Sequence, residues 1–247
     1  MSNLAARLYS LWAFFLFISM FAVLFPFFLI SIHVPGMYSL GPLLNRIWAR
    51  IFFFCMGMPV RIEYRGERPA RKGQYVFIAN HFSFLDIPSM GLLPYNFTFV
   101  GKSSLSKVPL FGYMYRNLHI TVDRSNFRDR YETVNRSIEA LREGKNLAIF
   151  PEGGIYTDNP PEMVRFKDGA FRVAIAEQIP LVPVTIPFNW IILPDDGLFL
   201  PRWSPQKLVI HEAIPTKGKT ADDIPALKEQ AFDVIDAELK RQCHARG

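Results

Sequence analysis

The 247-residue sequence has little cysteine and no clustered metal ligands. Its two cysteines, Cys55 and Cys243, lie far apart, and its five histidines are scattered. This spacing excludes a dense disulfide framework and gives no pattern typical of a zinc site. We therefore expect two free thiols in a reducing compartment and no bound metal ion.

A strong excess of either charge is also lacking. Lys and Arg together number 28 against 22 for Asp and Glu, which gives a formal net charge of +6. An excess of this size fits an anionic membrane surface or an anionic substrate. No zinc-finger or RNA-binding motif accompanies it, so we expect no nucleic-acid partner.

Two common catalytic loops are absent. The stretch Gly101-Lys102-Ser103-Ser104-Leu105 lacks the closing glycine of a nucleophile elbow. It is not a Walker loop either, because Asn96 stands where the first glycine of that motif is required. A covalent serine nucleophile is therefore not indicated.

Charge is missing altogether between Leu8 and Ile32, a run dominated by Leu, Phe and Ile. As a helix this run reaches about 37 Å, enough to cross the hydrocarbon core of a bilayer. A signal peptide has a shorter apolar region, and no clear small-x-small cleavage site follows here. We predict a retained membrane anchor, with a re-entrant or interfacial hairpin bent at Pro26 as the alternative.

A second apolar segment, Leu40 to Met58, carries Arg46 and Arg50 on one helical face. This pattern predicts an amphipathic helix at the level of the lipid headgroups, and the alternative is a core helix with two solvated arginines. Positive charge follows the first segment, whereas only Arg7 precedes it, which places the remainder of the chain on the cytoplasmic side of the cytoplasmic membrane. The following cations are Arg46, Arg50, Arg61, Arg65, Arg68, Arg71 and Lys72. We predict a membrane-anchoring unit over residues 1–58 and a catalytic domain over residues 59–247.

The remainder alternates short β-branched or aromatic runs with helical patterns. The predicted strands are Val60–Tyr64, Tyr75–Ala79, Phe97–Val100, His119–Val122, Leu147–Phe150, Val182–Ile186 and Leu208–His211. The predicted helices are Arg130–Glu143, which stops at Gly144, then Phe166–Gln178 and Ile224–Arg241. This alternation predicts an α/β domain with a mixed, largely parallel sheet flanked by helices, and sites at the strand ends.

Residues 80–86 read Asn-His-Phe-Ser-Phe-Leu-Asp and directly follow a predicted strand. On one continuous helix His81 and Asp86 would lie about 140° apart and could not meet. They can meet if His81 sits in the turn after the strand and Asp86 opens the next helix, and Pro88 favours that helix start. An aspartate so placed fixes the imidazole tautomer and stabilises its cation. The alternative is that Asp86 only caps the helix.

Two further blocks also follow predicted strands. Arg124 falls just beyond Ile120-Thr121-Val122, where a guanidinium can hold a phosphate at two points. The block Phe150-Pro151-Glu152-Gly153-Gly154 comes at another strand end, and its paired glycines predict a tight turn that a ligand can approach. A solvated surface arginine and a plain turn are the alternatives.

Together these blocks resemble the glycerolipid acyltransferase family, and in particular the bacterial lysophosphatidate acyltransferases. The first box of that family, Asn-His-x4-Asp, matches "NHFSFLD". The segment "GKSSLSKVPLFG" followed by "VDR" resembles the second box, "FPEGG" matches most of the third, and Val182–Ile186 looks like the fourth. The boxes occur in the order of the family and the resemblance spans about residues 40 to 215.

The resemblance implies a membrane-bound transfer of a fatty acyl group from an acyl thioester to the free hydroxyl of lysophosphatidate, which gives phosphatidate. His81 would be the general base and Asp86 would orient it. The implied substrate-binding residues are Asn80, Lys102, Arg124, Glu152, Gly153 and Gly154, with Arg124 on the acceptor phosphate and the glycine amides near the oxyanion. Acyl-CoA or acyl carrier protein would supply the acyl group, a membrane lipid would accept it, and no cofactor is expected.

The third box departs from the family at one place. Thr-Arg usually follows Glu-Gly, whereas Gly154 and Ile155 stand here. The second phosphate-binding arginine is thus missing from its position, and Arg165 or Lys167 could supply the charge. The departure leaves another hydroxyl lipid, such as a lyso-amino-acid lipid, as an alternative acceptor. An inactive lipid-binding relative and a thioester hydrolase are the alternatives to acyl transfer.

Overall fold

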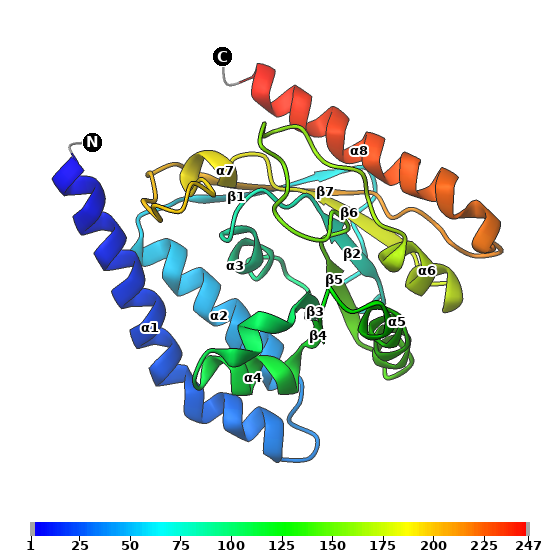
Figure 1. Ribbon diagram of the computed structural model, residues 1–247, viewed down its shortest axis with the longest axis horizontal. Helices are drawn as coiled ribbons and strands as arrows, with labels where there is room; N and C mark the ends of the chain where they lie inside the picture. Colours follow the sequence, from blue (N-terminus) through cyan, green and yellow to red (C-terminus); the bar gives the residue numbers. More distant parts are fainter. Residues whose placement is uncertain (1–2, 246–247) are drawn as a thin grey trace.

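Seven strands form one sheet in the computed structural model of the protein, which describes residues 3–245 (Figure 1). The strands are β1 (Val60–Arg65), β2 (Val76–Ala79), β3 (Phe97–Lys102), β4 (Ile120–Val122), β5 (Asn146–Ile149), β6 (Leu181–Thr185) and β7 (Gln206–His211). They lie in the order β1-β7-β6-β2-β5-β3-β4. All seven predicted strands are confirmed, each within two residues of its predicted bounds.

Five neighbouring strands run in the same direction, which decides where a site can form. β6 pairs with β2, β2 with β5, β5 with β3 and β3 with β4, all in parallel. β7 is antiparallel to β6 and carries β1 in parallel beside it. The sheet is therefore mixed and largely parallel, as predicted, and the carboxyl ends of five strands share one edge.

Helices cover both faces of this sheet (Figure 1). Those on one side are α1 (Asn3–His33), α2 (Leu40–Cys55) and α3 (Asp86–Met90), and those on the other are α5 (Phe127–Arg142), α6 (Gly169–Ala176) and α8 (Ile224–His244). The short elements η1 (Ser103–Lys107), α4 (Phe111–Leu118), α7 (Asn189–Ile192) and η2 (Ala221–Asp223) complete the chain. The first hydrophobic core lies between the sheet and the helices α1 to α3, and the second lies between the sheet and α5, α6 and α8. In β2, Phe77 and Ala79 point into the first core, and Val76 and Ile78 point into the second. Successive side chains of a strand point to opposite faces of the sheet. A strand that is buried on both faces therefore has a continuous run of apolar residues in its sequence.

The apolar helix α1 lies along the domain (Figure 1). Near its start the Tyr9 hydroxyl donates to the Met56 carbonyl at 2.8 Å, and near its end the Ser31 hydroxyl accepts the Gly41 N–H at 2.9 Å. The helix continues through Pro26 and is long and apolar enough to cross a membrane. Contacts recur along its length, so α1 packs on the domain from its start to its end.

The amphipathic helix predicted from Leu40 is present as α2. It buries Leu44 and Phe53 in the core and leaves Phe54 exposed. Arg46 is half-buried and donates to the side chain of Asn96, while Arg50 is exposed. The second segment is therefore an amphipathic helix that packs on the core with one side, and only one of its two arginines is solvated. Its position at the level of the lipid headgroups stays a prediction.

Local hydrogen bonds explain where the helices differ from their predicted bounds. α5 begins at Phe127, earlier than predicted, because the Asn126 side chain caps it by accepting the N–H groups of Arg128 (2.9 Å) and Asp129 (3.3 Å). Its end is as predicted, with Gly144 at φ 80° directly after the C-cap. α6 is shorter than predicted, since residues 166–168 join the loop that precedes it.

Phe171 offers a direct test of this packing. Its side chain on α6 is fully buried in the second core, so Phe171→Ala should cost about 3–5 kcal/mol of unfolding free energy. Phe127→Ala is the matched control, because that ring is 77% exposed. Urea unfolding in detergent micelles, followed by circular dichroism, measures both. Equal losses in the two variants would contradict the packing described here.

Candidate active site

The turn after β2 brings His81 and Asp86 together at the shared carboxyl edge of the sheet. β2 ends at Ala79, the chain turns, and α3 begins at Asp86 with Pro88 in its first turn. The His81 Nδ1 lies 3.0 Å from Asp86 Oδ2, and both residues are buried. The predicted strand-turn-helix geometry is confirmed.

The Asp86 carboxylate accepts hydrogen bonds at both oxygens. Besides the imidazole, Oδ2 receives the backbone N–H groups of Phe82 at 2.7 Å and Ser83 at 2.9 Å. Oδ1 receives the side-chain amide of Asn189 at 2.8 Å. The alternative, in which Asp86 only caps its own helix, is therefore wrong. The Asp86 carboxylate instead fixes the turn that precedes α3. Because every partner is a donor, the imidazole proton is assigned to Nδ1.

The His81 ring is held flat against Phe150. The two ring centroids are 4.2 Å apart with an interplanar angle of 20°. Its Nε2 lies on the far side of the ring from Nδ1 and forms no hydrogen bond within residues 3–245. A neutral imidazole with its proton on Nδ1 has a lone pair at Nε2. This nitrogen can therefore accept a proton from a bound hydroxyl.

Glu152 is a buried carboxyl group that holds the backbone of the same box. It follows β5, is fully buried, and accepts the His81 N–H at 2.7 Å and the Val164 N–H at 3.2 Å. Burial raises the pKa of Glu152 to about 8, although these two hydrogen bonds oppose the rise. At neutral pH most molecules therefore carry a proton on Glu152. Its contacts fix His81 from the backbone side.

Asn80 ties the box to β6. Its side-chain amide donates to the Ile186 carbonyl at 2.9 Å, and its carbonyl accepts the Ile186 N–H at 2.7 Å. The side chain is fully buried, and both of its polar atoms are used within the protein. This geometry gives Asn80 a structural contact between two strand ends, in place of the substrate contact expected from the sequence.

The other predicted site residues lie along the same edge. Lys167 donates its backbone N–H to the Pro151 carbonyl at 2.8 Å, and its side chain packs against Gly153, where φ is 81° and a Cβ would collide. Lys102 ends β3 and Arg165 lies in the loop after β5, both exposed. Arg124 is half-buried and lies two residues beyond β4. In the sheet β4 is three strand spacings from β2, which corresponds to about 14 Å.

The two glycines differ in what their amides can do. The Gly153 N–H donates to the Phe150 carbonyl at 3.0 Å, so it is not available for the oxyanion contact expected from the sequence. The Gly154 N–H forms no hydrogen bond within the part of the chain that the structure describes. Gly154 is therefore the better placed of the two to bind a developing negative charge.

Sequence reasoning missed Asn189 and Phe150 as parts of the site. Asn189 is buried, and its side-chain amide donates hydrogen bonds to the Asp86 carboxylate and, at 2.9 Å, to the Ser89 hydroxyl. Asn189 and Asp86 are 103 residues apart in the sequence. Nothing in the local sequence connects it to the histidine box. Phe150 was recognised as part of the third box, but its contact with the His81 ring was not predicted, because that contact depends on β5 lying beside β2.

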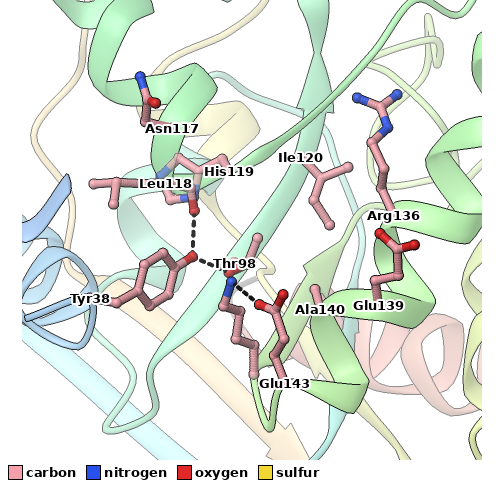
Figure 2. A pocket seen from close by; sticks show the side chains of 11 residues that line it. Tyr38, Thr98, Asn117, Leu118, His119, Ile120, Arg136, Glu139, Ala140 and Glu143 are labelled. Carbon is pink, nitrogen blue, oxygen red and sulfur yellow. Dashed lines mark hydrogen bonds and ion pairs between the residues drawn. The ribbon is translucent and has the colours of Figure 1, made fainter. Parts of the chain in front are cut away.

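A cavity of about 190 Å³ opens at the opposite edge of the sheet (Figure 2). The Tyr38 hydroxyl bonds Thr98 and the Leu118 carbonyl there, both at 3.0 Å. Lys145 pairs with Glu143 at its rim. Because these residues precede or begin β3, β4 and β5, the cavity lies away from His81 and Glu152, which follow the strands.

The pKa of Glu152 predicts a specific pH dependence of stability. Its pKa is about 8 when folded and 4.5 when unfolded, so stability from this group is highest below pH 4.5 and is lost as pH rises to about 8. Glu152→Gln should remove that loss. Urea midpoints of parent and variant between pH 5 and pH 8 measure the difference. Burial also lowers the pKa of His119 and of His211 to about 4, but both residues are the same in parent and variant, so their effects on stability cancel in the difference. Parallel pH profiles would contradict the assignment.

Comparison with known proteins agrees with this arrangement. The sequence model of the family described as Acyltransferase matches residues 61–187. A 1-acyl-sn-glycerol-3-phosphate acyltransferase of Saccharomyces cerevisiae is 32% identical over 200 residues, which cover 78% of this chain and 65% of that one. A lyso-ornithine lipid O-acyltransferase of Pseudomonas aeruginosa is 31% identical over 153 residues, covering 62% and 56%.

A solved structure shares the fold. The crystal structure of the 1-acyl-sn-glycerophosphate acyltransferase PlsC from Thermotoga maritima superimposes with a TM-score of 0.77, covers 98% of each chain and is 21% identical. The chain spans about half to two thirds of the length of the first curated relatives it matches. The family match contains both the His81–Asp86 box and the Glu152 turn. By its sequence, the chain belongs to the acyltransferase family.

Proposed function

We propose that the protein is a membrane-associated O-acyltransferase that moves a fatty acyl group from an acyl thioester to the free hydroxyl of lysophosphatidate, giving phosphatidate in phospholipid synthesis. The observation that carries this proposal is the 3.0 Å contact between His81 Nδ1 and Asp86 Oδ2. It leaves Nε2 as a proton acceptor at the carboxyl edge of the sheet. The names of the curated relatives support the reaction class and the acceptor.

In this reaction His81 and Asp86 act as one unit. The acceptor hydroxyl gives its proton to His81 Nε2 while its oxygen attacks the thioester carbonyl carbon. The resulting imidazolium is stabilised by Asp86, and the tetrahedral oxyanion by a backbone N–H such as that of Gly154. When the carbon–sulfur bond breaks, the leaving thiolate takes the proton from His81. The ester and a free thiol are the products, and no acyl-enzyme forms.

Positive side chains along the same edge would hold the acceptor phosphate. Arg124 lies beyond β4, and Lys167 packs against Gly153, one residue from Glu152. Lys167 therefore stands near the place where the family usually has its second arginine. Charge-assisted contacts from two sides of the edge would position the headgroup while the hydroxyl reaches His81.

A lyso-amino-acid lipid is the second candidate acceptor. Gly154 and Ile155 replace the Thr-Arg that usually follows in the third box, which removes one phosphate-binding charge. The lyso-ornithine lipid O-acyltransferase of Pseudomonas aeruginosa is 31% identical to this chain. Both observations favour testing an acceptor that carries no phosphate.

The apolar helix α1 supports a place at the membrane. Leu4, Leu8, Leu11, Phe15 and Ile18 recur every three or four residues and are all exposed. They form one apolar face directed away from the domain. We propose that this face enters the cytoplasmic membrane from its cytoplasmic side, where acyl-CoA or acyl carrier protein delivers the thioester.

His81→Ala should lower turnover by about 100-fold or more, because it removes the general base. His244→Ala is the matched control, since that residue is exposed at the end of α8. Labelled acyl-CoA or acyl carrier protein is offered with lysophosphatidate in lipid micelles, and mass spectrometry identifies the product. Circular dichroism shows that the variant remains folded.

The same assay decides between the alternatives. Labelled phosphatidate from the parent protein supports the first acceptor, and a labelled product from lyso-ornithine lipid alone supports the second. Free labelled fatty acid without an acceptor would indicate a thioester hydrolase. Equal turnover by His81→Ala and the parent would refute the proposed mechanism.

A further inference from the structure

The loop between α7 and β7 carries exposed apolar side chains beside the histidine box. Leu198 is 67% exposed, Phe199 43% and Trp203 55%. We call these three residues the apolar loop. One of them, Phe199, lies against Phe84, which belongs to the histidine box and is 47% exposed. Clustered exposure of this kind marks a surface that contacts a partner or a membrane.

Direct contacts join the apolar loop to α1 and to the box. The Phe199 ring lies 5.8 Å from Phe84 and 6.5 Å from Phe14 of α1, measured between centroids. The Ser10 hydroxyl of α1 donates to the Phe199 carbonyl at 2.7 Å. The Trp203 indole donates to the Gly57 carbonyl at 2.6 Å. The loop lies beside α7 and α1 (Figure 1).

The backbone of the loop presents an aromatic residue at a conformational cost. Phe199 has φ 51°, in the left-handed region, which residues other than glycine rarely adopt. The ring is nevertheless exposed rather than packed into the core. A strained backbone that displays an apolar side chain at a site is an observation that calls for a function.

The surroundings indicate which partner this surface fits. The apolar loop continues the outward face of α1, a helix apolar enough to cross a membrane. Arg7 on α1 and Arg202, which directly precedes Trp203, are both exposed. Asp195 and Asp196 lie at the start of the loop, where Asp196 accepts the Leu198 N–H at 2.9 Å. The exposed charges near the loop are thus two cations and two carboxylates, so the apolar face, and not its charge, indicates a bilayer as the partner.

We infer that the apolar loop is a second membrane-inserting element, which works beside α1 and holds the histidine box against a bilayer. The inference rests on the proposed membrane association, but not on the identity of the acceptor. Through Phe199 the loop contacts Phe84, which lies three residues after His81, so insertion of the loop would bring the histidine box to the bilayer surface. Because α1 packs on the domain along its length, the loop would add a second point of insertion next to the histidine box.

Site-directed fluorescence tests this inference on the full chain. In a Cys55→Ser, Cys243→Ser background, an environment-sensitive label is attached at Leu198→Cys. The matched positions are Leu11→Cys, on the outward face of α1, and Glu229→Cys, exposed on α8. With vesicles of phosphatidylcholine and phosphatidylglycerol, the labels at 198 and 11 should shift to shorter wavelength and be quenched by doxyl-labelled lipid. The label at 229 should do neither.

Other outcomes overturn the inference. A label at 198 that stays in water while the label at 11 inserts would leave α1 as the anchor and exclude the loop. Failure of both labels to insert would exclude membrane contact by this surface. A shift at 198 that grows with protein concentration without vesicles would assign the surface to a second copy of the chain. Acyl transfer measured in the same samples keeps failure of the proposed reaction distinct from each of these.

A second variant links insertion to catalysis. Leu198→Asp should lower activity on vesicle-borne lysophosphatidate more than activity on a monomeric short-chain lysophosphatidate, because a charge opposes insertion of the loop. Phe127→Asp is the control, since Phe127 is also exposed but lies on α5. Equal effects of Leu198→Asp on both substrates would contradict the inference.

Discussion

The contact between the Asp86 carboxylate and its donors holds the rest of the site in place. One oxygen binds the imidazole and two backbone N–H groups of the turn, and the other binds Asn189. A buried carboxylate without such partners would be costly, so the fold must supply them all. The same bonds that stabilise Asp86 therefore fix both the turn and the tautomer of His81.

The sheet supplies the remaining restraints from strands on either side of β2. Glu152 at the end of β5 binds the His81 backbone, and Asn80 binds Ile186 just beyond β6. Both side chains are fully buried, where an unpaired polar group costs more than it does at the surface. The position of the imidazole is thus set by three strand ends, and the cations along the edge remain free to meet a substrate.

The seven strands and the contact between His81 and Asp86 could be predicted from the sequence, because the residue patterns that indicate them lie within short segments. β-branched runs marked all seven strands, and Pro88 placed Asp86 at a helix start beside His81. Asn189 could not be found, since its contact with Asp86 depends on how distant segments pack. The lengths of α5 and α6 depended on a side-chain cap and a loop that periodicity does not reveal. The prediction that the Gly153 N–H binds the oxyanion was wrong, because this N–H donates to the Phe150 carbonyl within a turn.

The proton on the His81 ring tests the account most directly. In protein labelled with ¹⁵N-histidine and held in lipid micelles, long-range ¹⁵N–¹H correlation spectra show which ring nitrogen carries hydrogen when the imidazole is neutral. The account predicts the proton on Nδ1, with Nε2 bare. A proton found on Nε2, with Nδ1 bare beside Asp86, would contradict it.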